Sequence, residues 1–260
     1  MSALTGLRVL VTRPVEQAEE LCRLIEAQGG IAVRFPTIAV IATDDTEEIQ
    51  QRLLNLEHVD WLIFVSRNAV NFALKANNGK ITPNKTRIAA IGKATAETLN
   101  KAGLNVDLMP SVGFDSEALL AMPELQQIQG QIVLIVRGSG GRETLATVLT
   151  ERGAIVEYLD VYQRSIPSVD ESELYTLLNS HRLNILTATS GEVLENLLTM
   201  VTKSYHTLLF DLPLIVVSDR IKQLATDLGF KHIAVSSPSN EAILKAIISE
   251  QDNRGRVWLN

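Results

Sequence analysis

The chain has 260 residues, of which 46% are hydrophobic and 21% charged, enough to bury the core of one large domain or two ordinary ones. Its formal net charge of -6 argues against a general nucleic-acid binder, whose affinity comes from neutralising phosphates. A small anionic ligand is still compatible, because a local pocket can be positive on an acidic protein. The single cysteine, Cys22, excludes an intramolecular disulfide, and its helical neighbours predict an inert, half-buried thiol.

Targeting and membrane segments are not predicted. The stretch from Met1 to Arg13 lacks the long apolar region of a signal peptide. No run reaches the roughly 18 apolar residues that a membrane helix needs. The most apolar stretch, Leu208–Val217, contains Asp211 and Pro213 and is predicted to be a buried strand. We therefore expect a cytoplasmic protein with neither a membrane nor a nucleic-acid partner.

Short β-rich runs alternate with helical patterns along the chain, which favours parallel sheets. Each predicted strand ends in a polar turn, and glycines such as Gly29 and Gly103 mark helix ends. The clearest strand–helix pairs are Val9–Val11 with Val15–Gln28, Asp60–Val65 with Asn68–Lys75, and Ile88–Ile91 with Ala94–Ala102. Six such units are natural for two small sheets.

The chain contains an internal duplication. A shift of 124 residues places 7–13 on 131–137 and Val65-Ser66 on Thr189-Ser190. A shift of 126 places 88–92 on 214–218. The resemblance of all βα units to one another would explain similar patterns but not a shared register, so we predict two similar domains.

The domain boundaries have two solutions. The segments 34–40 and 158–164 are extended, β-rich and not followed by a helix, which is typical of linker strands. If both segments join the domains, the first domain is discontinuous (residues 1–36 and 167–260), the second is 43–158, and the linker strands are 37–42 and 159–166. The alternative is a simple split near Gly130, and periodicity does not choose between them.

Two common chemistries are not supported by the motifs. Gly138-Ser139-Gly140-Gly141 follows a predicted strand, but Glu143 stands where a dinucleotide fingerprint needs its third glycine, and no P-loop lysine follows. This argues against NAD and ATP. The four histidines are scattered without metal-ligand spacing, so no metal site is predicted.

Several turns in this order resemble those of uroporphyrinogen-III synthases. The opening strand and Thr12-Arg13-Pro14 are similar to that family's first turn. Later turns also match, in the same order and over nearly the whole chain: 64–70, 91–96, 134–138, 161–164, 189–191 and 216–221. The chain departs from the family pattern at Val65, where threonine is usual, and at Ser218-Asp219-Arg220, where the first half has Gly-Lys-Ala.

The resemblance implies an α/β fold of two similar domains with parallel, helix-flanked sheets, interleaved through two extended linker strands, with the ligand held between them. It also implies the reaction: cyclisation of hydroxymethylbilane to uroporphyrinogen III, with loss of water and inversion of ring D. No cofactor is expected, and the protein is expected to be a monomer. The alternative is a two-lobed small-molecule binding protein or sensor without catalysis.

Hydroxymethylbilane carries eight carboxylates, so an acidic enzyme has to hold it with local donors. Ser66, Thr95, Ser190 and Ser218 lie near predicted helix starts, where they either only cap the helix or also help the free amides bind an anion. Arg13 and Arg137 occupy equivalent turns and could each pair with a carboxylate. The expected substrate-binding residues are Arg13, Ser66, Asn68, Gly92, Thr95, Arg137, Gly138, Thr189, Ser190 and Ser218. Weaker candidates are Lys93, Arg142, Arg220 and Lys222.

Tyr162 is the candidate catalytic acid. The reaction mainly requires orientation of a flexible chain, but a proton donor would assist loss of the hydroxyl. A phenol stays protonated at neutral pH and can donate. The other interpretation of Tyr162 is a residue that packs within the linker.

Overall fold

In the computed structural model, the described residues are 3–141 and 143–257, with side chains described up to Asp252. The chain divides into two compact units: unit 1 consists of Met1–Ala39 and Ser165–Asn260, and unit 2 of Val40–Arg164. The chain therefore passes from one unit to the other twice. The assignment of 37–42 and 159–166 as linker strands stays a prediction.

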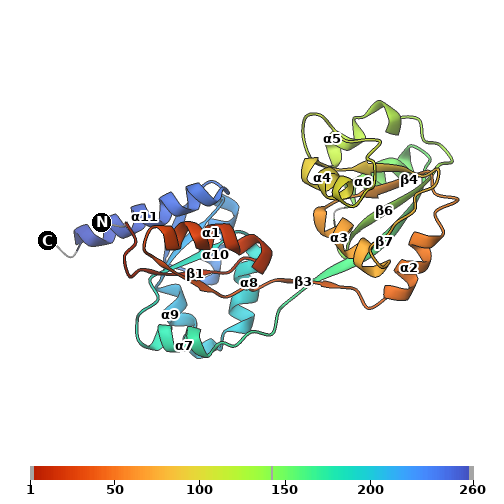
Figure 1. Ribbon diagram of the computed structural model, residues 1–260. Coiled ribbons are helices and arrows are strands. Elements are labelled where there is room, and N and C mark those ends of the chain that lie inside the picture. The colour runs from red at the N-terminus through yellow and green to blue at the C-terminus, as the bar shows by residue number, and fades with distance from the viewer. Residues whose placement is uncertain (1–2, 142, 258–260) are drawn as a thin grey trace. The chain divides into compact units, whose positions relative to one another are not determined.

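Unit 1 contains a five-stranded sheet in the order β10-β9-β8-β1-β2, with every neighbouring pair parallel. Strands and helices alternate along the chain (Figure 1). The elements are β1 (Arg8–Val11), α1 (Val15–Ala27), β2 (Ile31–Arg34), α7 (Ser172–Asn179), β8 (Ile185–Ala188), α8 (Gly191–Met200), η2 (Lys203–Tyr205), α9 (His206–Phe210), β9 (Pro213–Val216), α10 (Asp219–Leu228), β10 (His232–Val235) and α11 (Asn240–Val257).

Unit 2 contains a second five-stranded sheet in the order β3-β7-β6-β4-β5. The pairs β7/β6, β6/β4 and β4/β5 are parallel. The elements are β3 (Ala39–Ala42), α2 (Thr46–Leu54), β4 (Trp61–Phe64), α3 (Arg67–Ala76), β5 (Arg87–Ala90), α4 (Lys93–Lys101), α5 (Ser116–Leu120), η1 (Pro123–Leu125), β6 (Ile132–Gly138), α6 (Thr144–Glu151) and β7 (Ile155–Ser165).

Strand pairing confirms the predicted duplication residue by residue. In unit 1, β1 pairs with β8 through Leu10 and Leu186; a shift of 124 gives Leu134 and Leu62, which pair between β6 and β4 in unit 2. With the shift of 126, the pairing of Ile215 with Ala234 becomes the isolated bridge between Ala89 and Leu108. The two sheets thus share one strand order. Each sheet combines strands from the first half of the chain with strands from the second half.

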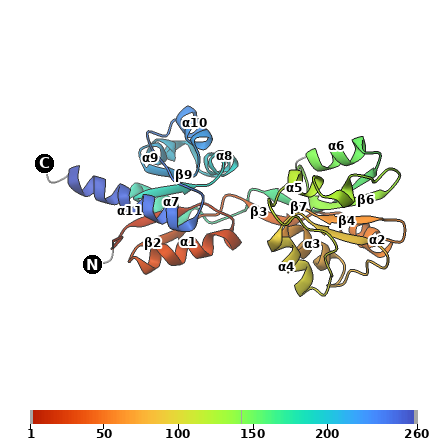
Figure 2. The same cartoon turned by 90° about the horizontal axis from the view of Figure 1, so that it is seen from above.

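Helices cover both faces of each sheet, so each unit has two apolar layers. In Figure 2, α1 lies on one side of the unit 1 sheet and α8, α9 and α10 on the other, while α5 and α6 lie opposite α3 and α4 in unit 2. Alternate strand residues supply the layers: Val9 and Val11 pack with α1 and α11, and Leu10 packs with α7, α8 and α10. The strands are therefore apolar on both faces, as buried parallel sheets require.

One predicted element was partly wrong. The apolar stretch Leu208–Val217 is not a continuous strand, because His206–Phe210 form helix α9 and strand β9 begins at Pro213. Proline is tolerated as the first residue of a strand, where it removes no interior ladder bond. Apolar content alone does not distinguish a buried helical turn from a strand. Among the described residues, every helix is too short or too polar to cross a bilayer.

Cys22 lies on the inner face of α1 and is completely buried, beyond the half-burial predicted. Burial raises the pKa of the thiol above its ordinary value of 9.0, mainly because the thiolate would lose its hydration. The unfolded thiol therefore ionises first as pH rises. The stability that the neutral thiol contributes is fully present below that ordinary pKa and is lost as pH rises toward the folded pKa.

We expect the free energy of unfolding of the wild type to fall more steeply between pH 8 and 10 than that of Cys22→Ala, by at most about 1.4 kcal/mol per pH unit. Urea titrations across this range measure the difference between the two slopes. Equal slopes in the two proteins would contradict a neutral buried thiol.

Candidate active site

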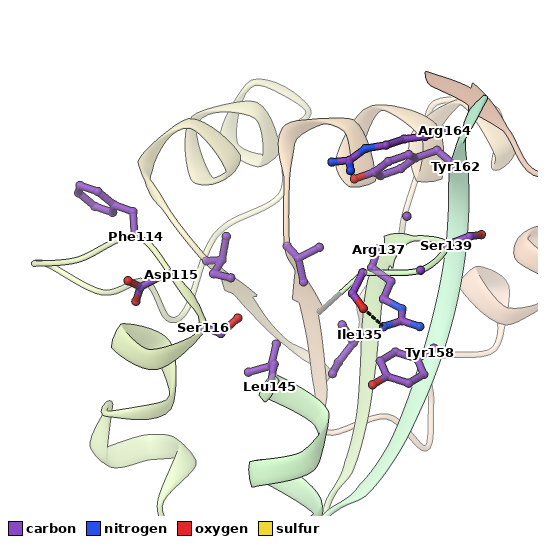
Figure 3. Close-up of a pocket in the computed structure, with 15 residues that line it drawn as sticks. Phe114, Asp115, Ser116, Ile135, Arg137, Ser139, Leu145, Tyr158, Tyr162 and Arg164 are labelled. Atoms are coloured by element: carbon purple, nitrogen blue, oxygen red, sulfur yellow. Dashed lines mark hydrogen bonds between the residues drawn. The ribbon is translucent and has the colours of Figure 1, made fainter. Parts of the chain in front are cut away.

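A pocket of about 320 Å³ opens in unit 2 at the carboxyl ends of its central strands. Open parallel sheets place their ligand sites at this edge. One part of the lining is basic and hydroxylic, with Arg137, Ser139, Tyr162 and Arg164. The other part is mostly apolar, with Val65, Ile91, Phe114, Ile135 and Leu145, and it also includes Asp115 and Ser116. Figure 3 shows Tyr162 and Arg164 side by side, with Phe114 and Asp115 on the opposite side. Such a lining suits a flat apolar ring that carries negative substituents.

Tyr162 lies at the end of β7 that meets the pocket. Its hydroxyl is 3.3 Å from Oγ of Ser66, and its ring centroid is 5.6 Å from that of Phe72. The ring lies directly over Gly138, and the backbone N–H of Ser139 donates to the Tyr162 carbonyl at 2.8 Å. The structure thus brings together three residues predicted separately from sequence: Tyr162, Ser66 and Gly138.

Arg137 lies at the end of β6, and its side chain is only 11% exposed. Its Nε donates to Asp160 at 2.9 Å, and its Nη1 lies 3.4 Å from the carbonyl of Gly141. The guanidinium carbon lies 3.5 Å from the centroid of the Tyr158 ring, a cation–π contact visible in Figure 3. The guanidinium is therefore held in a fixed orientation at the pocket wall, with part of its charge balanced by Asp160.

Arg13, the counterpart of Arg137, has different surroundings in unit 1. Its Nη1 donates to Oδ1 of Asn240 at 2.5 Å, and the amide of Asn240 donates to Glu20 at 2.7 Å. Burial lowers the pKa of the Arg13 guanidinium below its ordinary value, and the Glu20 carboxylate partly opposes this shift. The two arginines correspond in the duplication, but Arg137 is a residue of β6 whereas Arg13 lies beyond the end of β1, and different partners orient them.

The sequence matches the uroporphyrinogen-III synthase HemD family over residues 19–245. The uroporphyrinogen-III synthases of Salmonella typhimurium and Escherichia coli are 36% and 35% identical to the chain, over 93% of it and 100% of each relative. The chain belongs to the uroporphyrinogen-III synthase family.

Solved structures agree with the fold of this family. The chain is similar to a mutant uroporphyrinogen III synthase from Thermus thermophilus, with a TM-score of 0.59, 19% identity, and coverage of 95% of this chain and 99% of that one. The Helicobacter pylori enzyme gives a TM-score of 0.58 at 19% identity, covering 94% of this chain and 99% of that one. At these identities the likeness supports the two-domain α/β fold alone.

Three of the four hydroxyl residues predicted near helix starts cap helices. Ser66, Ser190 and Ser218 are the N-caps of α3, α8 and α10, and each side chain accepts a backbone N–H three residues later. The capping interpretation was wrong for Thr95. It is buried in the first turn of α4, where Gly92 is the N-cap and offers no side chain. The amides at the start of α4 thus lack a side-chain cap at the N-cap position.

Ser218→Ala is expected to lower the free energy of unfolding by about 1 kcal/mol, because α10 loses its cap. Ser218→Asn should retain most of that stability, since the asparagine side chain can accept the same N–H of Ile221. Urea denaturation of both variants measures the difference. An alanine variant as stable as the wild type would show that the cap contributes nothing.

The remaining predicted residues follow the carboxyl ends of strands in the two sheets. Asn68 is half-buried in the first turn of α3, and Thr189 is half-buried directly before Ser190. Lys93 is exposed and pairs with Glu97 at 3.9 Å, and Arg220 and Lys222 are exposed on α10. Arg142 lies outside the described residues. The predicted set therefore forms two groups, one in each unit: Ser66, Asn68, Gly92, Thr95, Arg137, Gly138 and Tyr162 in unit 2, and Arg13, Thr189, Ser190 and Ser218 in unit 1.

Sequence reasoning missed several residues at this site. Among them are Phe114, Tyr158 and Arg164, which line the pocket, and Asp160, which pairs with Arg137. A signal for three of them was present, because Tyr158, Asp160, Tyr162 and Arg164 alternate along one extended segment. Phe114 lies in a loop and is 58% exposed, so no periodicity points to it.

Proposed function

We propose that the protein cyclises hydroxymethylbilane to uroporphyrinogen III, releasing water and inverting ring D. The observation that carries the proposal is the gathering of Tyr162, Ser66 and Arg137 around one pocket in a member of this family. The pocket's 320 Å³ is at the lower end of the about 300–1,000 Å³ typical of small-molecule sites. It therefore fits one part of a linear tetrapyrrole, and the substrate contacts expected in unit 1 stay predictions.

Binding of carboxylates in this pocket uses two kinds of donor. The fixed guanidinium of Arg137 can form a charge-assisted hydrogen bond to a carboxylate from the pocket wall. The start of α4 follows the lining residue Ile91; its amides have no side-chain cap at Gly92, and a helix N-terminus attracts anions. The apolar side, with Ile91 and Leu145, can pack against a pyrrole ring. These contacts would fix the orientation of one ring, which is the main requirement for the correct closure.

Tyr162 would supply the proton. The C–O bond of the ring A hydroxymethyl group breaks, its electron pair leaves with oxygen, and the phenol proton converts that oxygen to water. The pyrrole nitrogen lone pair fills the electron-deficient carbon and gives an azafulvenium cation, whose charge balances that of the phenolate. Ring D then attacks through its substituted carbon, and the resulting spiro intermediate fragments. It recloses with ring D inverted through the unsubstituted α-carbon of that ring, which loses its proton and so restores the aromatic pyrrole and the overall charge balance. The hydroxyl of Ser66, 3.3 Å from the phenol, can donate to the phenolate that forms.

Purified protein given hydroxymethylbilane should yield the type III isomer without added metal or cofactor. Chromatography of the oxidised products separates the type I and type III isomers. Type I product alone, formed at the rate of the protein-free control, would overturn the proposed function. The cytoplasmic location and the monomeric state stay predictions, and size-exclusion chromatography tests the second.

A further inference from the structure

The pairing of β6 with β7 is irregular where the strands reach the pocket. Arg137 lies opposite Asp160, but the next residue, Gly138, lies opposite Tyr162, so Val161 is an extra residue on β7. Such a bulge re-aims the side chain that follows it. The hydrogen bond from Ser139 N–H to the Tyr162 carbonyl fixes the backbone beyond the bulge.

Gly138 provides the space that the Tyr162 ring occupies. A Cβ atom on Gly138 would lie 2.5 Å from Cζ and 2.9 Å from Cδ2 of the ring, and closer still to Cε2. The backbone of Gly138 does not have positive φ, so its conformation is open to other residues. Gly140 is the opposite case, with φ of +73° and no atom within 4 Å of the place that a Cβ would take. Glycine at position 138 is therefore required by the space that the Tyr162 ring occupies, and not by the backbone conformation of the turn.

Other side chains also contact the ring. Phe72 packs against it with a centroid distance of 5.6 Å, and Ser66 contacts its hydroxyl at 3.3 Å. A side chain at Gly138 would displace the ring, because the backbone of Gly138 is fixed by the strand pairing. A displaced ring would change its contacts with both Phe72 and Ser66.

We propose that Gly138 is a positioning residue for Tyr162: together with the bulge at Val161 it lets the phenol ring lie over Gly138 with its hydroxyl in contact with Ser66. This role rests on the proposed function, in which the phenol donates the proton. It differs from the substrate contact predicted for Gly138 from sequence, since the glycine acts through the tyrosine.

A double-mutant cycle in kcat for type III formation tests this role. Gly138→Ala should lower kcat about 10- to 10²-fold with little change in KM, because a misplacement of about 1 Å can have this effect. In a Tyr162→Phe background the same change should lower kcat no further, since no hydroxyl remains to be misplaced. A purely structural glycine would lower both backgrounds equally. Three results would overturn the proposal. Gly138→Ala could lower kcat equally in both backgrounds, it could leave kcat of the wild type unchanged, or Tyr162→Phe alone could have the kcat of the wild type.

Two further measurements separate this proposal from folding and from the proposed function. Gly130→Ala, just before the same strand, strains a backbone with φ of +75° but touches no side chain, so it should lower stability and leave kcat unchanged. A crystal structure of Gly138→Ala should show the phenol moved away from Ser66. A phenol still within hydrogen-bond distance overturns the proposal even if the wild type makes no type III product.

If Gly138→Ala does not fold, Gly138→Ala/Tyr162→Ala provides the test, because the second alanine removes every ring atom that the new Cβ would meet. The double variant should unfold at the same urea concentration as Tyr162→Ala alone. A double variant that also fails to fold would show that the ring is not what excludes a side chain at Gly138, and would overturn the proposal.

Discussion

Tyr162→Phe is expected to lower kcat for type III formation by about 10²-fold, with KM and the free energy of unfolding nearly unchanged. The substitution removes the phenol hydroxyl that contacts Ser66 and keeps the ring that packs on Phe72. Substrate binding and folding therefore lose little, whereas the departing hydroxyl loses its proton donor. Steady-state kinetics with separation of the isomers measures the effect, and urea denaturation checks the fold.

Tyr175→Phe is the matched control for this experiment. Its hydroxyl also forms hydrogen bonds, with Thr202 and Glu171, but it lies in unit 1 away from the predicted site residues. Its loss should reduce stability slightly and leave kcat unchanged. A Tyr162→Phe enzyme as fast as the wild type would remove Tyr162 from the acid role, and the residue would then be one that packs within β7.

Arg137→Gln is expected to lower kcat/KM by about 10- to 10²-fold, mainly through KM, because a charge-assisted hydrogen bond to a carboxylate is lost. The variant should also lose about 1 kcal/mol of stability, since Asp160 loses its partner at a half-exposed position. Initial rates over a range of substrate concentrations separate KM from kcat. Unchanged KM would show that Arg137 only supports the strand pairing.

Two further variants distinguish the effect of Arg137 on substrate binding from its effect on stability. Arg137→Gln/Asp160→Asn removes both charges, so it should recover stability but not KM. Arg87→Gln removes another arginine that stacks on an aromatic ring, with its guanidinium carbon 4.0 Å from the Trp61 ring centroid, at the opposite end of β5 from the pocket. It should leave KM unchanged. A raised KM in Arg87→Gln would mean that general charge, and not position, governs substrate affinity.

The fold was largely predictable because the duplication constrains register as well as pattern. The shift that aligns Leu10 with Leu134 also aligns their partners, Leu186 and Leu62, in the two sheets. Helix ends were marked by Gly29 and by Gly103, which both have φ of +78°, where glycine is favoured. The stretch before Pro213 was misassigned because a single apolar helical turn has no distinguishing period.

The site was predictable only in part. Family motifs and helix starts identified Ser66 and Tyr162, but their contact depends on the bulge at Val161, which no local pattern marks. Arg13 and Arg137 correspond in the duplication but differ in their surroundings, because Arg137 is a residue of β6 that pairs with Asp160, while Arg13 lies beyond β1 and contacts Asn240 of α11. Which partner orients a side chain is a property of tertiary packing, and it leaves little trace in sequence spacing.

The strand order has a consequence for synthesis of the chain. Unit 2 is one continuous segment, so its sheet can close soon after residue 165 has left the ribosome. β1 belongs between β2 and β8, and its neighbour β8 begins only at Ile185. β1 therefore has one unpaired edge during synthesis, and unit 2 can fold before β8 is available to pair with that edge. Because exposed strand edges promote aggregation, the edge of β1 that pairs with β8 is open to aggregation until β8 has been made.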